Sequence, residues 1–106
     1  MSVTMEPVLY PDWREKVAFG ADGPQPTVLI ENEKMKVVLA GLKPGQKIPP
    51  HPATQGVYHF LQGSGWMTVG DERHAIAAGA TMIVPQGAAR GIEAETELVF
   101  LAVRTP

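Results

Sequence analysis

The sequence predicts an all-β domain, a sandwich or barrel of short strands, from two observations. The 106 residues include 11 glycines and 10 prolines, about a fifth of the chain. Residues that break regular structure at this frequency disfavour long helices. Apolar runs of strand length also recur about every ten residues and are separated by turn residues, which is the spacing of a β-sandwich or barrel.

The composition indicates one globular domain and excludes several classes of function. Apolar residues make up 44% of the chain, and 9 basic against 11 acidic residues give a net charge of −2. This balance leaves no basic surface for nucleic acid or an anionic membrane. Cysteine is absent, which excludes disulfides, thiolate metal sites and cysteine nucleophiles. Because neither a long apolar run nor a signal-like N-terminus is present, we expect a cytoplasmic protein.

Residues 1–26 are expected to form an N-terminal arm with one or two short strands. Trp13 and Phe19 are the aromatic residues expected to pack this arm against the rest of the protein. The segment Asp22-Gly23-Pro24-Gln25-Pro26 is typical of a loop and ends the arm. The main β domain is therefore expected to cover residues 27–106.

The main domain is expected to contain short strands at regular intervals. The first two are apolar at successive positions, which predicts strands that are covered on both faces. The proline-rich segment before the third strand is expected to be a rigid loop that holds His51. The expected strands are Thr27–Asn32, Met35–Leu42, Val57–Leu61, Trp66–Val69, Arg73–Ala77, Thr81–Val84, Ala89–Ala94 and Glu97–Arg104.

Two glycine–proline patterns carry a resemblance to a known family. In the first pattern, five residues separate Gly45 from His51, and Gly63 closes the segment. The second pattern is Gly79-ATMIV-Pro85-Gln86-Gly87-Ala88-Ala89-Arg90. In order and spacing, the two patterns resemble the two sequence motifs of the cupin superfamily. The resemblance covers Thr27 to Val103 and implies a cupin-type jelly-roll β-barrel of two antiparallel sheets.

The same resemblance implies a degenerate metal site. Metal-bearing cupins use two histidines and a glutamate from the first motif and a histidine from the second. Here those positions hold His51, Ala53, Gly56 and Arg90. In an alternative alignment His51 takes the place of the second histidine, and the first falls on Pro49. Either alignment keeps one ligand of four, so no cofactor is expected; the alternative is one divalent metal ion bound through His51.

Strand periodicity and the motifs together place four side chains at the mouth of the barrel. If position 56 faces inward, as the glutamate does in metal-bearing relatives, Tyr58 shares its face because side chains alternate along a strand. Arg90 takes the place of an inward ligand, and its buried charge requires either a carboxylate partner or an anionic ligand. The expected ligand pocket consists of His51, Gln55, Tyr58 and Arg90.

The remaining histidines and the strand methionines are expected to have structural roles. His59 faces away from the pocket on an apolar strand, which favours a packing or interface histidine. His74 lies two residues before Ile76 and therefore shares its face of the strand, so an inward position is possible. The residues expected to fill the core are Met35, Met67 and Met82.

These observations leave three functions open. The first is a metal-free cupin that binds a small anionic or carboxylate-bearing molecule, with Arg90 holding the anion. The second is a cupin-type isomerase, lyase or dioxygenase, in which His51 acts as general acid or base or as a metal ligand. The third is a structural or regulatory dimer module. The resemblance also implies a homodimer with an arm that crosses to the partner, and neither nucleic acid nor membrane is expected as a partner.

Overall fold

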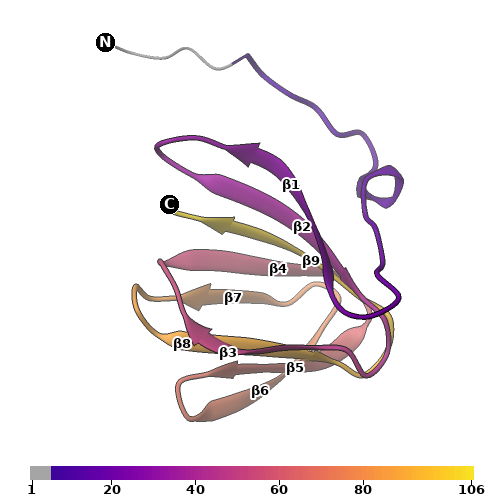
Figure 1. Cartoon of the computed structure of the whole chain (residues 1–106), viewed down its shortest axis with the longest axis vertical. Coiled ribbons are helices and arrows are strands. Elements are labelled where there is room, and N and C mark those ends of the chain that lie inside the picture. Colours follow the sequence, from indigo (N-terminus) through magenta and orange to yellow (C-terminus); the bar gives the residue numbers. More distant parts are fainter. Residues whose placement is uncertain (1–5) are drawn as a thin grey trace.

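The computed structural model describes residues 6–106, which form two antiparallel β-sheets that face each other (Figure 1). The larger sheet has five strands in the order β1-β2-β9-β4-β7, and the smaller has four in the order β3-β8-β5-β6. Every strand pairing is antiparallel. The all-β class and the two antiparallel sheets predicted above are therefore confirmed.

All eight strands predicted for the main domain are present, with ends that differ from the prediction by no more than two residues. The larger sheet contains β1 (Gln25–Glu31), β2 (Lys36–Leu42), β9 (Leu98–Arg104), β4 (Gly56–Gln62) and β7 (Thr81–Val84). The smaller sheet contains β3 (Lys47–Pro52), β8 (Ala89–Ala94), β5 (Ser64–Val69) and β6 (Glu72–Ala77).

The strand β3 was not predicted, because its segment was interpreted as a loop. Pro49, Pro50 and Pro52 have no backbone N–H to donate, and such residues are tolerated in a sheet only at its edge. β3 is an edge strand that pairs with β8 alone. The prolines therefore determine where this strand lies in the sheet rather than whether it forms.

The described part of the arm, residues 6–24, contains no strand, so the predicted arm strands are wrong there. Its regular element is η1, a 3₁₀ helix over Trp13–Glu15. The Asp12 carboxylate caps this helix by accepting the backbone N–H of Arg14 at 3.0 Å, and this bond lowers the pKa of Asp12. No helix within residues 6–106 has the length and apolar character that crossing a membrane requires. As expected, Phe19 packs the arm against the main domain. Its ring lies so close to Gly41 of β2 that a Cβ added to this glycine would be only 2.9 Å from the ring.

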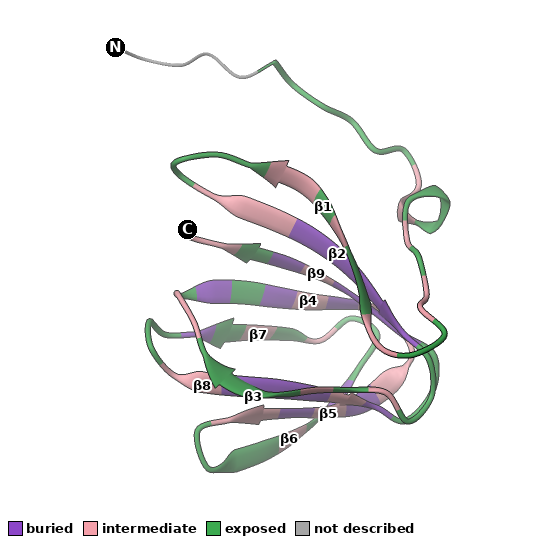
Figure 2. Cartoon of the chain, viewed as in Figure 1, coloured by how far each residue is buried: buried purple, intermediate pink, exposed green. Residues whose placement is uncertain are grey.

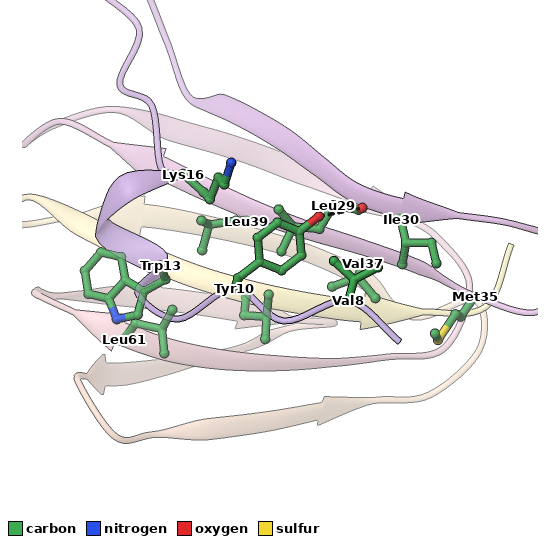
Figure 3. A pocket seen from close by; sticks show the side chains of 11 residues that line it. Val8, Tyr10, Trp13, Lys16, Leu29, Ile30, Met35, Val37, Leu39 and Leu61 are labelled. Atoms are coloured by element: carbon green, nitrogen blue, oxygen red, sulfur yellow. Dashed lines mark hydrogen bonds between the residues drawn. The ribbon is translucent and has the colours of Figure 1, made fainter. Parts of the chain in front are cut away.

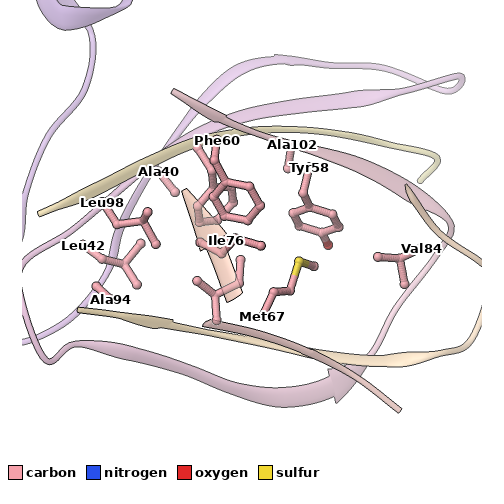
Figure 4. Packing of buried hydrophobic residues seen from close by; sticks show 12 residues of the cluster. Ala40, Leu42, Tyr58, Phe60, Met67, Ile76, Val84, Ala94, Leu98 and Ala102 are labelled. Atoms are coloured by element: carbon pink, nitrogen blue, oxygen red, sulfur yellow. The ribbon is translucent and has the colours of Figure 1, made fainter. Parts of the chain in front are cut away.

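The hydrophobic core lies between the two sheets (Figures 2 and 4). Along β4 the inward residues Gly56, Tyr58 and Phe60 are buried, whereas Val57 and His59 on the other face are more exposed, as predicted. Phe60 is fully buried and contacts the Phe100 ring at a centroid distance of 5.9 Å. Alternation along this strand therefore separates a core face from an outer face.

The three strand methionines do not share one environment. Met67 is fully buried in the core and Met82 packs against it, as predicted. Met35 instead lies on the outer face of the larger sheet, so its predicted core position is wrong. It lies one residue before β2, whose residues are apolar on both faces, and hydrophobicity alone does not distinguish those faces.

The motif glycine Gly63 is needed for both its backbone angle and its small size. It connects β4 to β5 with φ of 84°, a left-handed conformation that favours glycine. A Cβ at this position would also collide with the backbone carbonyl of Glu97. Gly45 has a similar φ of 85° but open space around it, so only its turn geometry requires glycine.

Candidate ligand site

A cavity of about 320 Å³ lies between the two sheets. β1, β2, β4 and β9 contribute residues from the larger sheet, and β3 and β8 contribute residues from the smaller. Four side chains with polar groups line it: His51, Tyr58, Arg90 and Arg104. Within residues 6–106, no aspartate or glutamate does so. Its apolar wall includes Val38, Ala40, Ile48, Ile92, Phe100 and Ala102.

Arg90 is buried, with 2% of its surface exposed, and its guanidinium connects two loops. Nη2 donates to the carbonyls of Ala53 at 3.0 Å, Ala88 at 3.1 Å and Pro85 at 3.3 Å. Nε donates to the Ala88 carbonyl at 3.2 Å. The side chain thereby holds the loop before β4 against the loop before β8.

No carboxylate neutralises the charge of Arg90 in the described part of the chain, where every ion pair involves other residues. Nη1 donates to the Tyr58 hydroxyl at 3.3 Å. A guanidinium has five N–H groups, and these contacts leave one Nη1 hydrogen without an acceptor among residues 6–106. Among residues 6–106, Arg90 therefore has no carboxylate partner, and its side chain is buried rather than exposed to solvent.

A β-bulge turns His51 toward the cavity. Ile48 and His51 are three residues apart and would face opposite ways in a regular strand, yet both line the cavity. The register shift between them places two residues of β3 opposite the single residue Gly91. A Cβ on Gly91 would lie 2.8 Å from the Pro50 nitrogen, so the glycine leaves room for the bulge. His51 becomes the cross-strand neighbour of Arg90.

The hydrogen bond of His51 identifies which ring nitrogen carries the proton. Nδ1 lies 3.0 Å from the carbonyl oxygen of Pro49. A carbonyl can only accept, so Nδ1 must be the donor. In the neutral imidazole Nε2 is then unprotonated and can accept a hydrogen bond or a proton. The His51 side chain is exposed, which places it at the cavity mouth rather than at its base.

Gln55 does not join the other three predicted residues. It is exposed and lines a different hollow, on the outer face of the larger sheet. Its backbone N–H donates to the Gln86 side-chain oxygen at 3.2 Å. Gln55 lies two residues before Val57, an outward residue of β4, and therefore continues the outward parity.

Arg104 is a cavity residue that the sequence analysis missed. It is the last residue of β9, lies opposite Gly56, and shares the inward parity of Ala102 and Phe100. Its side chain makes no hydrogen bond or ion pair with residues 6–106. The alternation of side chains between the two faces of β9 could have placed Arg104 in the cavity.

The motif positions do not fit a divalent metal ion, which usually needs about three protein ligands. His51 offers one nitrogen, Ala53 and Gly56 have no side-chain ligand atom, and Arg90 is a cation. A Cβ at Gly56 would lie 3.1 Å from the Arg104 Cβ and 3.4 Å from Tyr58 Cε1, so neighbours already crowd the glutamate position. No three His, Cys, Asp or Glu side chains within residues 6–106 gather into a metal-binding group.

The other two histidines lie outside the cavity. His59 faces outward from β4, as expected, and its Nδ1 lies 2.7 Å from the Thr81 hydroxyl. His74 is partly exposed on β6, where its Nε2 lies 3.5 Å from a Glu72 carboxylate oxygen. Neither contributes to the group around Arg90.

Two facing antiparallel sheets around an internal pocket define a small double-stranded β-helix protein. The family model described as Cupin domain matches residues 38–104. The chain therefore belongs to the cupin family, and the resemblance stated above is confirmed. None of the curated proteins matches the sequence.

Solved structures of three other proteins share this fold. A Thermus thermophilus protein is 26% identical, with 92% of this chain and 96% of that chain covered and a TM-score of 0.84. A Klebsiella pneumoniae protein with a double-stranded β-helix domain is 24% identical, with coverages of 95% and 91% and a TM-score of 0.85. A Streptococcus pyogenes protein of unknown function is 23% identical, with coverages of 100% and 96% and a TM-score of 0.82.

Proposed function

We propose that this cupin binds a small organic anion, in the simplest case a carboxylate, in the cavity between its sheets. The observation that carries the proposal is the buried guanidinium of Arg90, which no acidic side chain neutralises within residues 6–106. Burial of an ionised group is costly unless it is paired, and carbonyl dipoles solvate a charge without cancelling it. A bound anion would supply the missing negative charge and an acceptor for the free Nη1 hydrogen.

The rest of the cavity suits a ligand with an anionic end and an apolar body. Arg104 adds a second cation, and His51 offers a hydrogen-bonding ring at the mouth. The walls around Phe100 and Ile92 are apolar. A volume of about 320 Å³ lies at the lower end of the range of small-molecule sites, roughly 300–1,000 Å³. Because the loop carbonyls already hold Arg90 in place, binding would cost little ordering of this side chain.

Thermal unfolding with a panel of small mono- and dicarboxylates, each paired with its uncharged amide, tests the proposal. A bound acid at 100 times its Kd adds about 2.7 kcal/mol, which for a domain of this size raises Tm by roughly 10 °C. The amide should have no effect. If no carboxylate in the panel raises Tm, the proposal is wrong.

Two variants connect any such shift to the cavity. Arg90→Lys keeps the charge but loses the planar fork, and Arg104→Gln removes the second cation at a position without side-chain bonds to the described residues. Each should weaken binding about tenfold or more, the size expected when one charge-assisted hydrogen bond is lost. Arg73→Gln, on the smaller sheet and outside the cavity, is the matched control and should bind like the wild type. Wild-type affinity in both cavity variants would contradict the proposal.

The hydrogen bond of His51 supports a second candidate, proton transfer on the bound carboxylate without a metal. Nε2 would take a proton from the carbon next to the carboxylate and later return it, while Arg90 and Tyr58 stabilise the enediolate formed between the two steps. Exchange of this proton for deuterium in D₂O, followed by NMR, tests the idea. His51→Gln should abolish exchange but keep binding. If wild-type protein exchanges none of the carboxylates that it binds, this candidate is excluded.

A further inference from the structure

The two arginines of the cavity differ in how much of each guanidinium remains open to a ligand. Arg90 is buried, and its contacts leave a single Nη1 hydrogen without an acceptor among residues 6–106. Arg104 is half-buried at the end of β9 and also borders the outer hollow that Gln55 lines, which places it at the rim of the cavity. The guanidinium of Arg104 has no acceptor within the described residues. One buried cation and one rim cation therefore face the same cavity.

Tyr58 lies beside both arginines. Its hydroxyl accepts the Arg90 Nη1 hydrogen bond at 3.3 Å. Its ring approaches Arg104 at Gly56, which lies opposite Arg104 on β9. A Cβ added to Gly56 would lie 3.1 Å from the Arg104 Cβ and 3.4 Å from Tyr58 Cε1. The Arg104 side chain therefore begins beside the ring whose hydroxyl meets Arg90, so both guanidinium groups are within reach of one small molecule.

The rim carries another cation, but that one is already neutralised. Lys36 of β2 is the cross-strand partner of Arg104. The Cβ atoms of such partners are about 5 Å apart, and like charges at this distance repel each other. Lys36 Nζ lies 3.6 Å from a Glu31 carboxylate oxygen, whereas Arg104 pairs with no acid among residues 6–106. Of the two neighbouring cations, Arg104 is therefore the one that needs an anion.

We propose that the ligand of the cavity carries two anionic groups, in the simplest case a short dicarboxylate with one end at Arg90 and the other at Arg104. This inference rests on the proposed function, because it adds a second anion to the same site. Arg90 would make one charge-assisted hydrogen bond, whereas the open fork of Arg104 suits a bidentate carboxylate. The apolar wall, which includes Val38, Ile92 and Phe100, suits the methylene chain between the two ends.

A second hollow, between the N-terminal arm and the larger sheet, lacks this arrangement of charges (Figure 3). Its volume is about 410 Å³, and Lys16 is the only charged residue among those of residues 6–106 that line it. Lys16 Nζ lies 5.8 Å from the centre of the Tyr10 ring. A single exposed ammonium group attracts one carboxylate and offers nothing to a second, so a dianion should prefer the cavity between the sheets.

Calorimetric titration with the linear dicarboxylates from malonate to adipate, each paired with its mono-amide, tests the inference. The wild type should bind at least one diacid about tenfold or more tightly than its mono-amide, the effect expected of one charge-assisted hydrogen bond. Arg104→Gln should remove this preference, and Arg104→Lys should keep part of it because the charge remains.

Two matched controls each remove one cation outside the proposed site. Lys36→Gln removes the rim cation that Glu31 already neutralises, and Lys16→Gln removes the cation of the other hollow. Both variants should keep the wild-type preference for the diacid. A preference that either substitution abolishes would contradict the assignment of the second anion to Arg104.

The outcomes distinguish this inference from the proposed function. If the mono-amides bind as tightly as the diacids, or if Arg104→Gln keeps the preference, the second anion site is wrong and the proposed function still stands. A diacid affinity that Arg104→Gln lowers but Arg90→Lys leaves unchanged would place the ligand in the outer hollow beside Lys34 and overturn both proposals. If none of these acids binds, both proposals are wrong.

Discussion

The two faces of the larger sheet differ in their charged and aliphatic residues. In most antiparallel sheets the face toward the core is apolar and the other is polar. Here the inner face carries Arg104 next to core residues such as Phe100 and Ala102, whereas the outward residues Val57, Val103 and Val37, which are cross-strand partners, are aliphatic. The larger sheet therefore places a cation on the side of the cavity and aliphatic side chains on its outer face.

The strand β4 shows this comparison most directly. Its inward residues, Tyr58 and Phe60, are buried by the opposite sheet, and the Tyr58 hydroxyl contacts Arg90. Its outward residues, Val57 and His59, lie on a face that the smaller sheet does not cover. Three pairs of substitutions test this difference.

Substitutions at an inward and at an outward residue of β4 should change the free energy of unfolding by very different amounts. Phe60→Ala should lower the free energy of unfolding by about 3–5 kcal/mol, because it leaves a cavity among fully buried side chains. Val57→Ala should cost under about 1 kcal/mol at low protein concentration, where the outer face is exposed. Urea unfolding at two protein concentrations measures both values. A Val57→Ala loss as large as that of Phe60→Ala at both concentrations would contradict the assignment of faces.

The two cavity arginines should differ in their importance for stability. Arg90→Met leaves the carbonyls of Ala53, Pro85 and Ala88 without their donor, and we expect a loss of roughly 2–4 kcal/mol. Arg104→Met should change stability by under about 0.5 kcal/mol, since no side-chain bond within residues 6–106 is lost. Urea midpoints of the two variants provide the comparison. Equal losses would show that the carbonyl contacts of Arg90 contribute nothing to stability.

The smallest expected effect is that of the hydroxyl at the Arg90 guanidinium. Tyr58→Phe removes the acceptor of the Arg90 Nη1 hydrogen bond and should cost about 1 kcal/mol. His59→Gln, one residue along and on the outer face, is its control and should be nearly neutral. Thermal unfolding measures both. A neutral Tyr58→Phe variant would indicate that water or a bound ligand satisfies Arg90 in place of the phenol.

Local patterns predicted most of the fold. The spacing of turn residues and of apolar runs depends on near neighbours in the chain, so strand positions followed from it. The inward face of Tyr58 followed from alternation along β4 together with the cupin motif, which places position 56 inward. β3 did not follow, because the effect of a proline in a strand depends on whether a neighbour pairs with its N–H side. That information belongs to the sheet order and is not present in the segment itself.

The candidate site was predictable where a strand or motif fixed a residue, and not elsewhere. His51, Tyr58 and Arg90 line one cavity, whereas Gln55 follows the outward parity of β4. Arg104 was missed because a charged residue at a strand end is usually solvated. The carbonyl partners of Arg90 come from two loops far apart in the sequence, and no local pattern reveals such a contact.

The prolines of β3 have a consequence for how copies of this protein can meet. An exposed strand edge normally offers a ladder of amide groups on which another chain can extend the sheet, which is the first step toward fibrils. Pro49, Pro50 and Pro52 remove half of the donors of this six-residue strand. The prolines therefore disfavour the addition of another strand to the smaller sheet at β3.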